Sequence, residues 1–176
     1  MRKSYVLMLV AAALLVLLAG LGLLNGLWGQ KNGPAAATPT KTDIPAALGG
    51  LPLVETITGD EGVAQTNRLH GLDVGLDRGY VAQYAGSGSR ATMWVGWAEN
   101  EAAAQALVDR MTAKIGPGHP IFQDLQALSF GQRTVFAATG QGQQHFYFHS
   151  GSAVVWIAVD GTAAPDVMHD ALRSFP

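Results

Sequence analysis

The sequence has no cysteine and few charged residues, and these two absences exclude several classes of protein. Without cysteine the chain forms no disulfide, no thiolate metal site, no cysteine nucleophile, no covalent c-type haem attachment and no thioether lipid anchor. Charged residues make up 14% of the chain, compared with about a quarter of an average soluble protein. The length of 176 residues allows one domain of ordinary size and an additional segment.

The missing charge is concentrated at the start of the chain. After Arg2 and Lys3, no acidic or basic residue occurs between residues 4 and 30, and Val6–Leu24 is almost wholly Leu, Val and Ala. A helix that spans a bilayer needs about 20 mainly apolar residues. We therefore predict a transmembrane signal-anchor over residues 1–28, which contacts the lipid bilayer through residues 4–28. Trp28 would lie at the interface, with the basic N-terminus in the cytoplasm.

A cleaved secretory signal is the alternative, because Ala35-Ala36-Ala37 offers small residues for a peptidase. The apolar core of a secretory signal usually runs about 7–15 residues, and this one is longer, which favours the uncleaved anchor. Both alternatives export the rest of the chain. The predicted protein is a bacterial-type single-pass membrane protein with an extracytoplasmic domain, or a secreted protein cut near Ala37.

Residues 29–50 are rich in Gly, Ala, Pro and Thr, and Pro39 and Pro45 interrupt any helix. We predict that they form a flexible tether and that residues 51–176 form one extracytoplasmic domain. Once Arg2 and Lys3 are set aside, 9 basic residues remain against 13 acidic ones, and none of the basic residues form a run. A nucleic-acid partner needs clustered positive charge, so we expect none.

Periodicity within the domain alternates between helices and hairpins. Apolar spacing predicts helices over residues 58–69, 100–115 and 163–175. Paired β-favouring stretches flank glycine-containing turns, which predicts a short strand at 51–57 and hairpins at 80–84 with 90–97, 125–130 with 133–139, and 144–149 with 152–159. The expected fold is α+β, a mainly antiparallel sheet with helices packed on one face. Residues 80–111 and 145–175 share a ββα pattern, which is compatible with an internal duplication.

Side chains alternate across a strand, so the register of each hairpin sorts its residues by face. We expect Ala85 opposite Arg90 in the first hairpin. A turn at Ser150-Gly151 would place His145 opposite Trp156 in the third. One face then carries the apolar core, and the other is polar and aromatic, with Trp94, His145, Tyr147, His149 and Trp156.

The polar and aromatic face is the strongest functional signal in the sequence. Aromatic side chains with a polar group are common at binding hot spots. We predict that Trp94 and Trp156 anchor a protein partner at the membrane or a cell-envelope ligand, with His145, Tyr147 and His149 as polar contacts. Alternatively, a helix or loop covers this face and the Trp residues form a second small core. A further alternative is a site for a small molecule, metal or cofactor at His145 and Trp156.

No motif for catalysis occurs in the sequence. There is no G-x-S-x-G nucleophile elbow, and Gly86-Ser-Gly-Ser89 joins two strands rather than a strand and a helix. His145 and His149 are four residues apart on a strand, about 13 Å at 3.3 Å per residue, so they cannot chelate one ion together. We expect a non-enzymatic protein with no catalytic residues, metal ligands or cofactor.

Overall fold

The computed structural model describes residues 44–70 and 74–176. The chain divides into two units, residues 1–34 and 35–176, and the described residues belong to the second. The predicted transmembrane segment and most of the predicted tether lie outside the described residues. Within the described ranges, no helix has both the length and the apolar character needed to cross a membrane.

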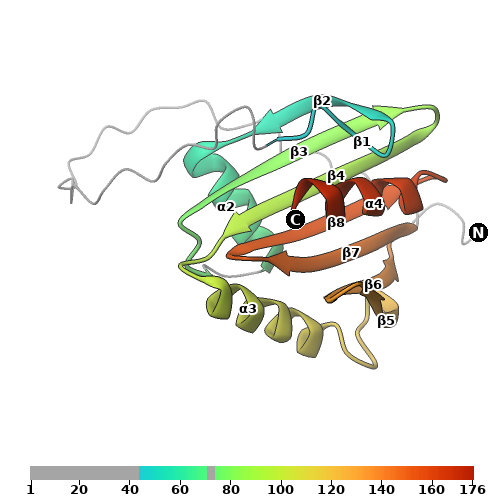
Figure 1. Ribbon diagram of the computed structural model, residues 1–176. Helices are drawn as coiled ribbons and strands as arrows, with labels where there is room; N and C mark the ends of the chain where they lie inside the picture. Colours follow the sequence, from blue (N-terminus) through green and yellow to red (C-terminus); the bar gives the residue numbers. More distant parts are fainter. Residues whose placement is uncertain (1–43, 71–73) are drawn as a thin grey trace, which may run out of the picture. The chain divides into compact units, whose positions relative to one another are not determined.

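The second unit is an eight-stranded antiparallel sheet with three helices (Figure 1). The α+β class is therefore confirmed. Along the sheet the strand order is β1-β2-β3-β4-β8-β7-β6-β5. The strands are β1 (Ala47–Leu48), β2 (Leu51–Ile57), β3 (Arg78–Gly86), β4 (Ser89–Trp97), β5 (Phe122–Phe130), β6 (Arg133–Gly140), β7 (Gln143–Ser150) and β8 (Ala153–Asp160), and the helices are α2 (Gly59–His70), α3 (Glu101–Lys114) and α4 (Ala164–Ser174).

The first of these strands lies within the range that the sequence predicts to be a tether. β1 pairs with β2, and Leu48 is fully buried in the hydrophobic core. The described residues of both core clusters belong to one compact unit, residues 35–176.

The β3–β4 hairpin has the predicted register, with Ala85 opposite Arg90. Its turn has two residues, Ser87 and Gly88, whereas the predicted turn had four, Gly86-Ser-Gly-Ser89. Gly86 pairs with Ser89, and Ser87 and Gly88 both have positive φ values of 50° and 77°. Two successive residues with positive φ are the signature of the type I′ turn, whose twist matches that of the flanking strands.

The β7–β8 hairpin differs from its predicted register by two residues. Tyr147, not His145, lies opposite Trp156. The turn residues are Gly151 and Ser152, because Ser150 pairs with Ala153 and Gly151 takes the positive φ of 52° that a tight turn requires. A shift of two residues leaves every side chain on its predicted face.

Helices cover both faces of the sheet, so the expectation that they lie on one face is wrong. α4 packs on the face that carries Met93, Val95 and Ile157, which we call the Ile157 face, and Figure 1 shows this helix in front of β8. α3 packs on the opposite face, which carries Tyr147, Val154 and Trp156 and which we call the Trp156 face. β8 is apolar along almost its whole length, so both of its faces have to be covered.

The two ββα segments are alike in their strands only. β4 and β8 are antiparallel neighbours, and Trp94 pairs directly with Trp156 across them. A twofold axis that exchanges two antiparallel neighbouring strands is perpendicular to the sheet, so it does not interchange the two faces of the sheet. The helix after β4 and the helix after β8 nevertheless lie on opposite faces. A duplication that relates these strands would therefore not include the helices.

Candidate functional site

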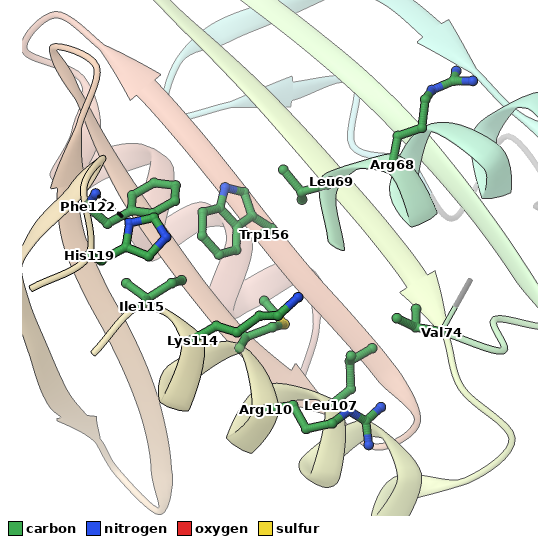
Figure 2. A pocket seen from close by; sticks show the side chains of 11 residues that line it. Arg68, Leu69, Val74, Leu107, Arg110, Lys114, Ile115, His119, Phe122 and Trp156 are labelled. Carbon is green, nitrogen blue, oxygen red and sulfur yellow. Dashed lines mark hydrogen bonds between the residues drawn. The ribbon is translucent and has the colours of Figure 1, made fainter. Parts of the chain in front are cut away.

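A cavity of about 320 Å³ lies on the Trp156 face, where residues of α2, α3, β8 and the segment after α3 meet (Figure 2). Small-molecule sites in proteins range from about 300 to about 1,000 Å³. The cavity is therefore large enough for a small organic ligand, at the lower end of that range.

The floor of the cavity is apolar. Trp156 of β8 is 5% exposed, and Leu107, Met111 and Ile115 are similarly buried. These last three residues are spaced by four, so they form one row along the side of α3 that faces the sheet. Leu69 and Val74 supply further apolar surface from α2 and the segment that precedes β3. The space between helix and sheet therefore favours an apolar group.

Phe122 and His119 form one wall of the cavity, and Figure 2 shows their rings side by side. The Phe122 ring lies 5.5 Å from Trp156, with an interplanar angle of 65°, which is the edge-to-face geometry that aromatic pairs prefer. The His119 ring lies 5.2 Å from Phe122. His119 Nδ1 accepts hydrogen bonds from the amides of Ile121, at 3.2 Å, and Phe122, at 3.1 Å. In the neutral ring the proton is therefore on Nε2, which remains as a donor.

The rim of the cavity is cationic. Arg110 and Lys114 are exposed and extend from α3 beside the cavity, while Arg68 extends away from them (Figure 2). Arg68 forms an ion pair with Glu61, with 2.7 Å between Nη2 and Oε1. None of the described residues that line the cavity is acidic. The described part of the lining therefore combines an apolar interior with positively charged side chains at its edge.

A hydrogen bond attaches α3 to the sheet beside the cavity. The hydroxyls of Thr112 and Tyr147 lie 3.1 Å apart. Thr112 donates its own proton to the carbonyl of Val108, so Tyr147 is the donor to Thr112. Burial raises the pKa of Tyr147, and its hydrogen bond to Thr112 opposes that shift. The neutral phenol therefore holds the last turn of α3 against β7.

Of the two alternatives that the sequence left for the Trp156 face, open or covered, the structure shows the covered one, because α3 and Phe122 lie over much of it. Tyr147 is fully buried, and Trp156 and His145 are 5% and 6% exposed. Tyr147 stacks on Trp156 with 5.0 Å between centroids and an interplanar angle of 6°. This is the second small core that was the alternative on sequence grounds. Whether the five residues bind a partner stays a prediction, but three of them present little surface to one.

The two remaining predicted residues are partly exposed and lie apart from the cavity lining. Trp94 packs at the margin of the second core. His149 bonds through Nε2 to Oε1 of Gln105 on α3, at 2.7 Å. Of the five predicted site residues, Trp156 is the one that lines the cavity.

The sequence prediction missed the cationic rim. Arg110 and Lys114 of α3 each precede a buried residue, namely Met111 in the helix and Ile115 at its C-cap. Positive residues beside an apolar row on one helix were a signal that the sequence contained. Its meaning depends on the gap between α3 and the sheet, which spacing alone does not reveal.

His145 is a buried histidine whose ring is neutral. Its Nε2 donates to the carbonyl of Gly140 at 3.1 Å, and Nδ1 has no hydrogen-bond partner among the described groups. Burial lowers the pKa of His145, and the hydrogen bond to Gly140 opposes that shift in part. Protonation would place a charge beside Phe122 and Trp156, whose rings lie 5.0 Å and 5.6 Å away.

This histidine predicts that the domain loses stability in mild acid. The unfolded chain binds a proton at His145 as the pH falls through about 6.5, whereas the folded chain binds it only at lower pH. The free energy of unfolding therefore decreases as the pH is lowered from the pKa of His145 in the unfolded chain to its pKa in the folded chain. At higher pH this histidine does not change the stability. His145→Phe should reduce the drop in melting temperature between about pH 7.5 and about pH 5. The matched control is His169→Gln at an exposed histidine, and an equal drop in all three proteins would contradict the prediction.

In residues 44–70 and 74–176, no group of three or more His, Asp or Glu side chains is arranged to hold a metal ion. Comparison with protein-family models, curated proteins and solved structures found no match to this chain. Function therefore has to be inferred from the cavity and the residues around it.

Proposed function

We propose that this protein is a non-enzymatic binding domain and that its ligand is a small molecule with an apolar body, held in the cavity on Trp156. The observation that carries the proposal is the cavity of about 320 Å³ with a floor of Trp156, Leu107, Met111 and Ile115. An apolar pocket with a few polar groups at its edge is the usual form of a small-molecule site. Water is a poor occupant of an apolar cavity, so a ligand that fills it gains from burial.

Between the two functions considered on sequence grounds, the cavity favours the small-molecule site over docking on the sheet. A docked partner needs an accessible surface, and Tyr147, His145 and Trp156 are buried. A metal or haem iron bound at His145, as considered on sequence grounds, would need a free nitrogen of that ring, and His145 uses Nε2 on the Gly140 carbonyl while Nδ1 is enclosed. A cell-envelope ligand remains within the proposal, provided that its apolar part is small enough to enter the cavity.

We also propose that this domain acts outside the cytoplasm, tethered to the membrane by residues 4–28. The support is the uncharged apolar run in the sequence. Alkaline phosphatase fused to the C-terminus should be active in intact cells, since that enzyme needs the oxidising envelope to form its disulfides. An inactive phosphatase, together with a bright cytosolic fluorescent-protein fusion, would show that the domain is not exported.

Binding of a neutral apolar dye tests the site. Residues 35–176 form one compact unit, so a fragment with these bounds is titrated with N-phenyl-1-naphthylamine, which carries no charge and brightens in apolar surroundings. We expect saturable binding of one dye per chain. Leu69→Trp, which adds bulk to a partly exposed residue at the cavity, should weaken binding at least tenfold.

A tryptophan placed elsewhere controls for this change. Val54 on β2 is 59% exposed and does not line the cavity, so Val54→Trp should bind the dye as the natural sequence does. Both variants should keep the melting temperature within a few degrees. No saturable binding, or equal binding by Leu69→Trp, would show that the cavity is not a ligand site.

A further inference from the structure

We infer that two copies of this chain associate through the outer edge of β5, the last strand of the sheet. The segment 126–130 of each copy would pair antiparallel with the same segment of the other copy, so that two eight-stranded sheets join into one. This segment does not line the cavity on Trp156. The association therefore does not depend on the proposed function.

β5 lies at the end of the sheet (Figure 1) and pairs with β6 on one side only. Among the residues that the structure describes, the segment 126–130 forms no hydrogen bond on its other side. The side chains of Gln126, Ala127 and Ser129 are exposed. An edge strand presents backbone N–H and C=O groups that another strand can pair with. This part of β5 is therefore open to a further strand.

The two edges of the sheet differ in their protection against such pairing. Proteins prevent edge strands from associating with short covering strands, proline, charged residues and bulges. The opposite edge has all of these, because β1 covers the start of β2, Pro52 lacks an N–H, Glu55 is charged and the pairing of β2 is irregular there. Residues 125–130 of β5 contain no charged residue and no proline, and Asp124 lies in the bulge that precedes the regular segment. The regular segment of β5 is therefore unprotected.

A second copy of the chain is the occupant that this edge fits. An uncharged segment that pairs with itself brings no like charges together, whereas like charges opposite each other destabilise a sheet. The twofold axis between two antiparallel strands is perpendicular to the sheet, so each face of one copy continues into the same face of the other. Leu128 lies opposite Val135 of the Ile157 face, and Phe130 packs against the core of that face. The association would therefore extend one apolar side across both copies.

The residues that precede the described domain suit this edge less well. The chain reaches the sheet at β1, which is seven strand spacings from β5, about 34 Å along the sheet at about 4.8 Å per spacing. Pro34 and Pro39 have no N–H to donate, and Lys41 and Asp43 are charged. Residues 29–43 would therefore have to cross the whole sheet to supply a strand that pairs poorly.

The β5–β6 hairpin determines which groups of β5 point outward. Phe130 and Arg133 pair beside a two-residue turn, in which Gly131 has a positive φ of 64°. In such a hairpin the two residues beside the turn bond to each other, and bonded and non-bonded pairs then alternate along the strands. The N–H and C=O groups of Ala127 and Ser129 therefore point away from β6.

These outward groups are satisfied by a register that is centred on Leu128. Ala127 of each copy then pairs with Ser129 of the other, and each of these pairs exchanges both of its backbone hydrogen bonds. Leu128 lies opposite Leu128 on the twofold axis, and Gln126 lies opposite Phe130. This register uses the whole regular segment of β5 and leaves the bulge outside it.

The absence of cysteine allows a direct test with single-cysteine variants of the full chain in mild detergent. Leu128 and its copy would form a non-bonded pair with Cα atoms about 4.5 Å apart, within the range of about 4.4–6.8 Å for a disulfide. Leu128→Cys, oxidised with copper phenanthroline, should therefore give a covalent dimer. Gln126→Cys is the control, because its two copies would be offset by four residues, about 13 Å along the strands. Its yield of dimer should be at least fivefold lower.

Positive charge on the edge should prevent the association. Ala127→Lys with Ser129→Lys brings ammonium groups of the two copies opposite each other, whereas both side chains are exposed in the single chain. Analytical ultracentrifugation should give the unsubstituted chain the mass of two copies and this double variant the mass of one, with the melting temperature of the single domain retained. Thr56→Lys, at an exposed residue of β2 on the opposite edge, should remain dimeric. In the Leu128→Cys chain, the two Lys changes should lower the yield of covalent dimer to that of Gln126→Cys.

Hydrogen exchange at the amides of Ala127 and Ser129 separates the other occupants of this edge. A monomer in which these amides exchange rapidly would mean that the edge is free or takes another protein, and it would overturn the inference. A monomer in which they are protected would mean that a segment of the same chain, such as residues 29–43, covers the edge, and it would also overturn the inference. A dimer that persists in the double Lys variant would place the interface elsewhere, with the same consequence.

Discussion

Replacing Trp156 with alanine is expected to lower the free energy of unfolding by about 3–5 kcal/mol, the usual cost of removing a large buried aromatic side chain. The indole stacks on Tyr147 and contacts Phe122 and His145 at its edges. Its removal would join the cavity to the space that the indole leaves. The surroundings can collapse only in part, because α3 is held to β7 by the bond between Thr112 and Tyr147. Urea unfolding of residues 35–176, followed by circular dichroism, measures the loss.

Trp94→Ala is the matched control. Trp94 pairs with Trp156 across β4 and β8 and points to the same face, but it is only partly buried. Its loss should cost less than half as much as that of Trp156. Equal losses would mean that both indoles are core residues to the same degree. An unchanged midpoint for Trp156→Ala would show that α3 does not cover this face in solution.

Replacing Gly62 with alanine is expected to destabilise the domain, although the same change in an ordinary helix interior stabilises by up to about 1 kcal/mol. α2 lies so close to β2 and β3 that a Cβ at residue 62 would be 2.6 Å from the Gly79 carbonyl oxygen and 2.9 Å from that of Ile57. Both atoms belong to the backbone and cannot rotate away. We expect a loss of about 1–3 kcal/mol, the range for an overpacked core.

Gln65→Ala tests whether this loss is local. Gln65 is on the same helix and bonds with its side chain to Glu61. Its replacement should change the free energy of unfolding by no more than about 0.5 kcal/mol. A higher melting temperature for Gly62→Ala would contradict the close approach of α2 to the sheet. The same urea titration as for Trp156→Ala provides the measurement.

Apart from β1, the order and type of the elements could be predicted from the sequence because each carries a clear pattern. The predicted strands are rich in β-favouring residues, the turns contain glycine, and α3 and α4 have apolar stripes. The register of β7 and β8 was predicted incorrectly because alternation has a period of two and does not detect a shift of two. Ser150-Gly151 and Gly151-Ser152 are equally good turn sequences. The structure selects the second by pairing Ser150 with Ala153.

The sequence of β8 indicates that both faces of the sheet are buried, and the prediction did not use this pattern. From Ala153 to Val159, β8 contains no polar residue. Such a run is typical of a strand that is buried on both sides, whereas a strand with one exposed face alternates. The presence of Tyr147 and two histidines on β7 suggested an open face. In the structure α3 and Phe122 enclose Tyr147 and His145, whereas His149 is partly exposed, and His145 satisfies its Nε2 on the Gly140 carbonyl.

The cavity could not have been predicted from the spacing of residues along the sequence. Its residues come from α2, α3, the segment that follows α3, and β8, so Leu69 and Trp156 are far apart in the sequence. Only the packing of α3 at a distance from α2 leaves space between them. Among the residues that line the cavity, the sequence analysis predicted Trp156 as a binding residue. It did not predict that Trp156 would form the floor of a cavity.

β8 belongs to both hydrophobic cores, since Trp156 and Ile157 are neighbours in the chain and point to opposite sides of the sheet. If the core on one face of the sheet lost its packing, β8 would no longer be held in place for the core on the other face. The domain should therefore unfold as one cooperative unit. An occupant of the cavity would stabilise α4, on the far side, as much as the helices that it touches, because ligand binding raises the stability of the whole cooperative unit.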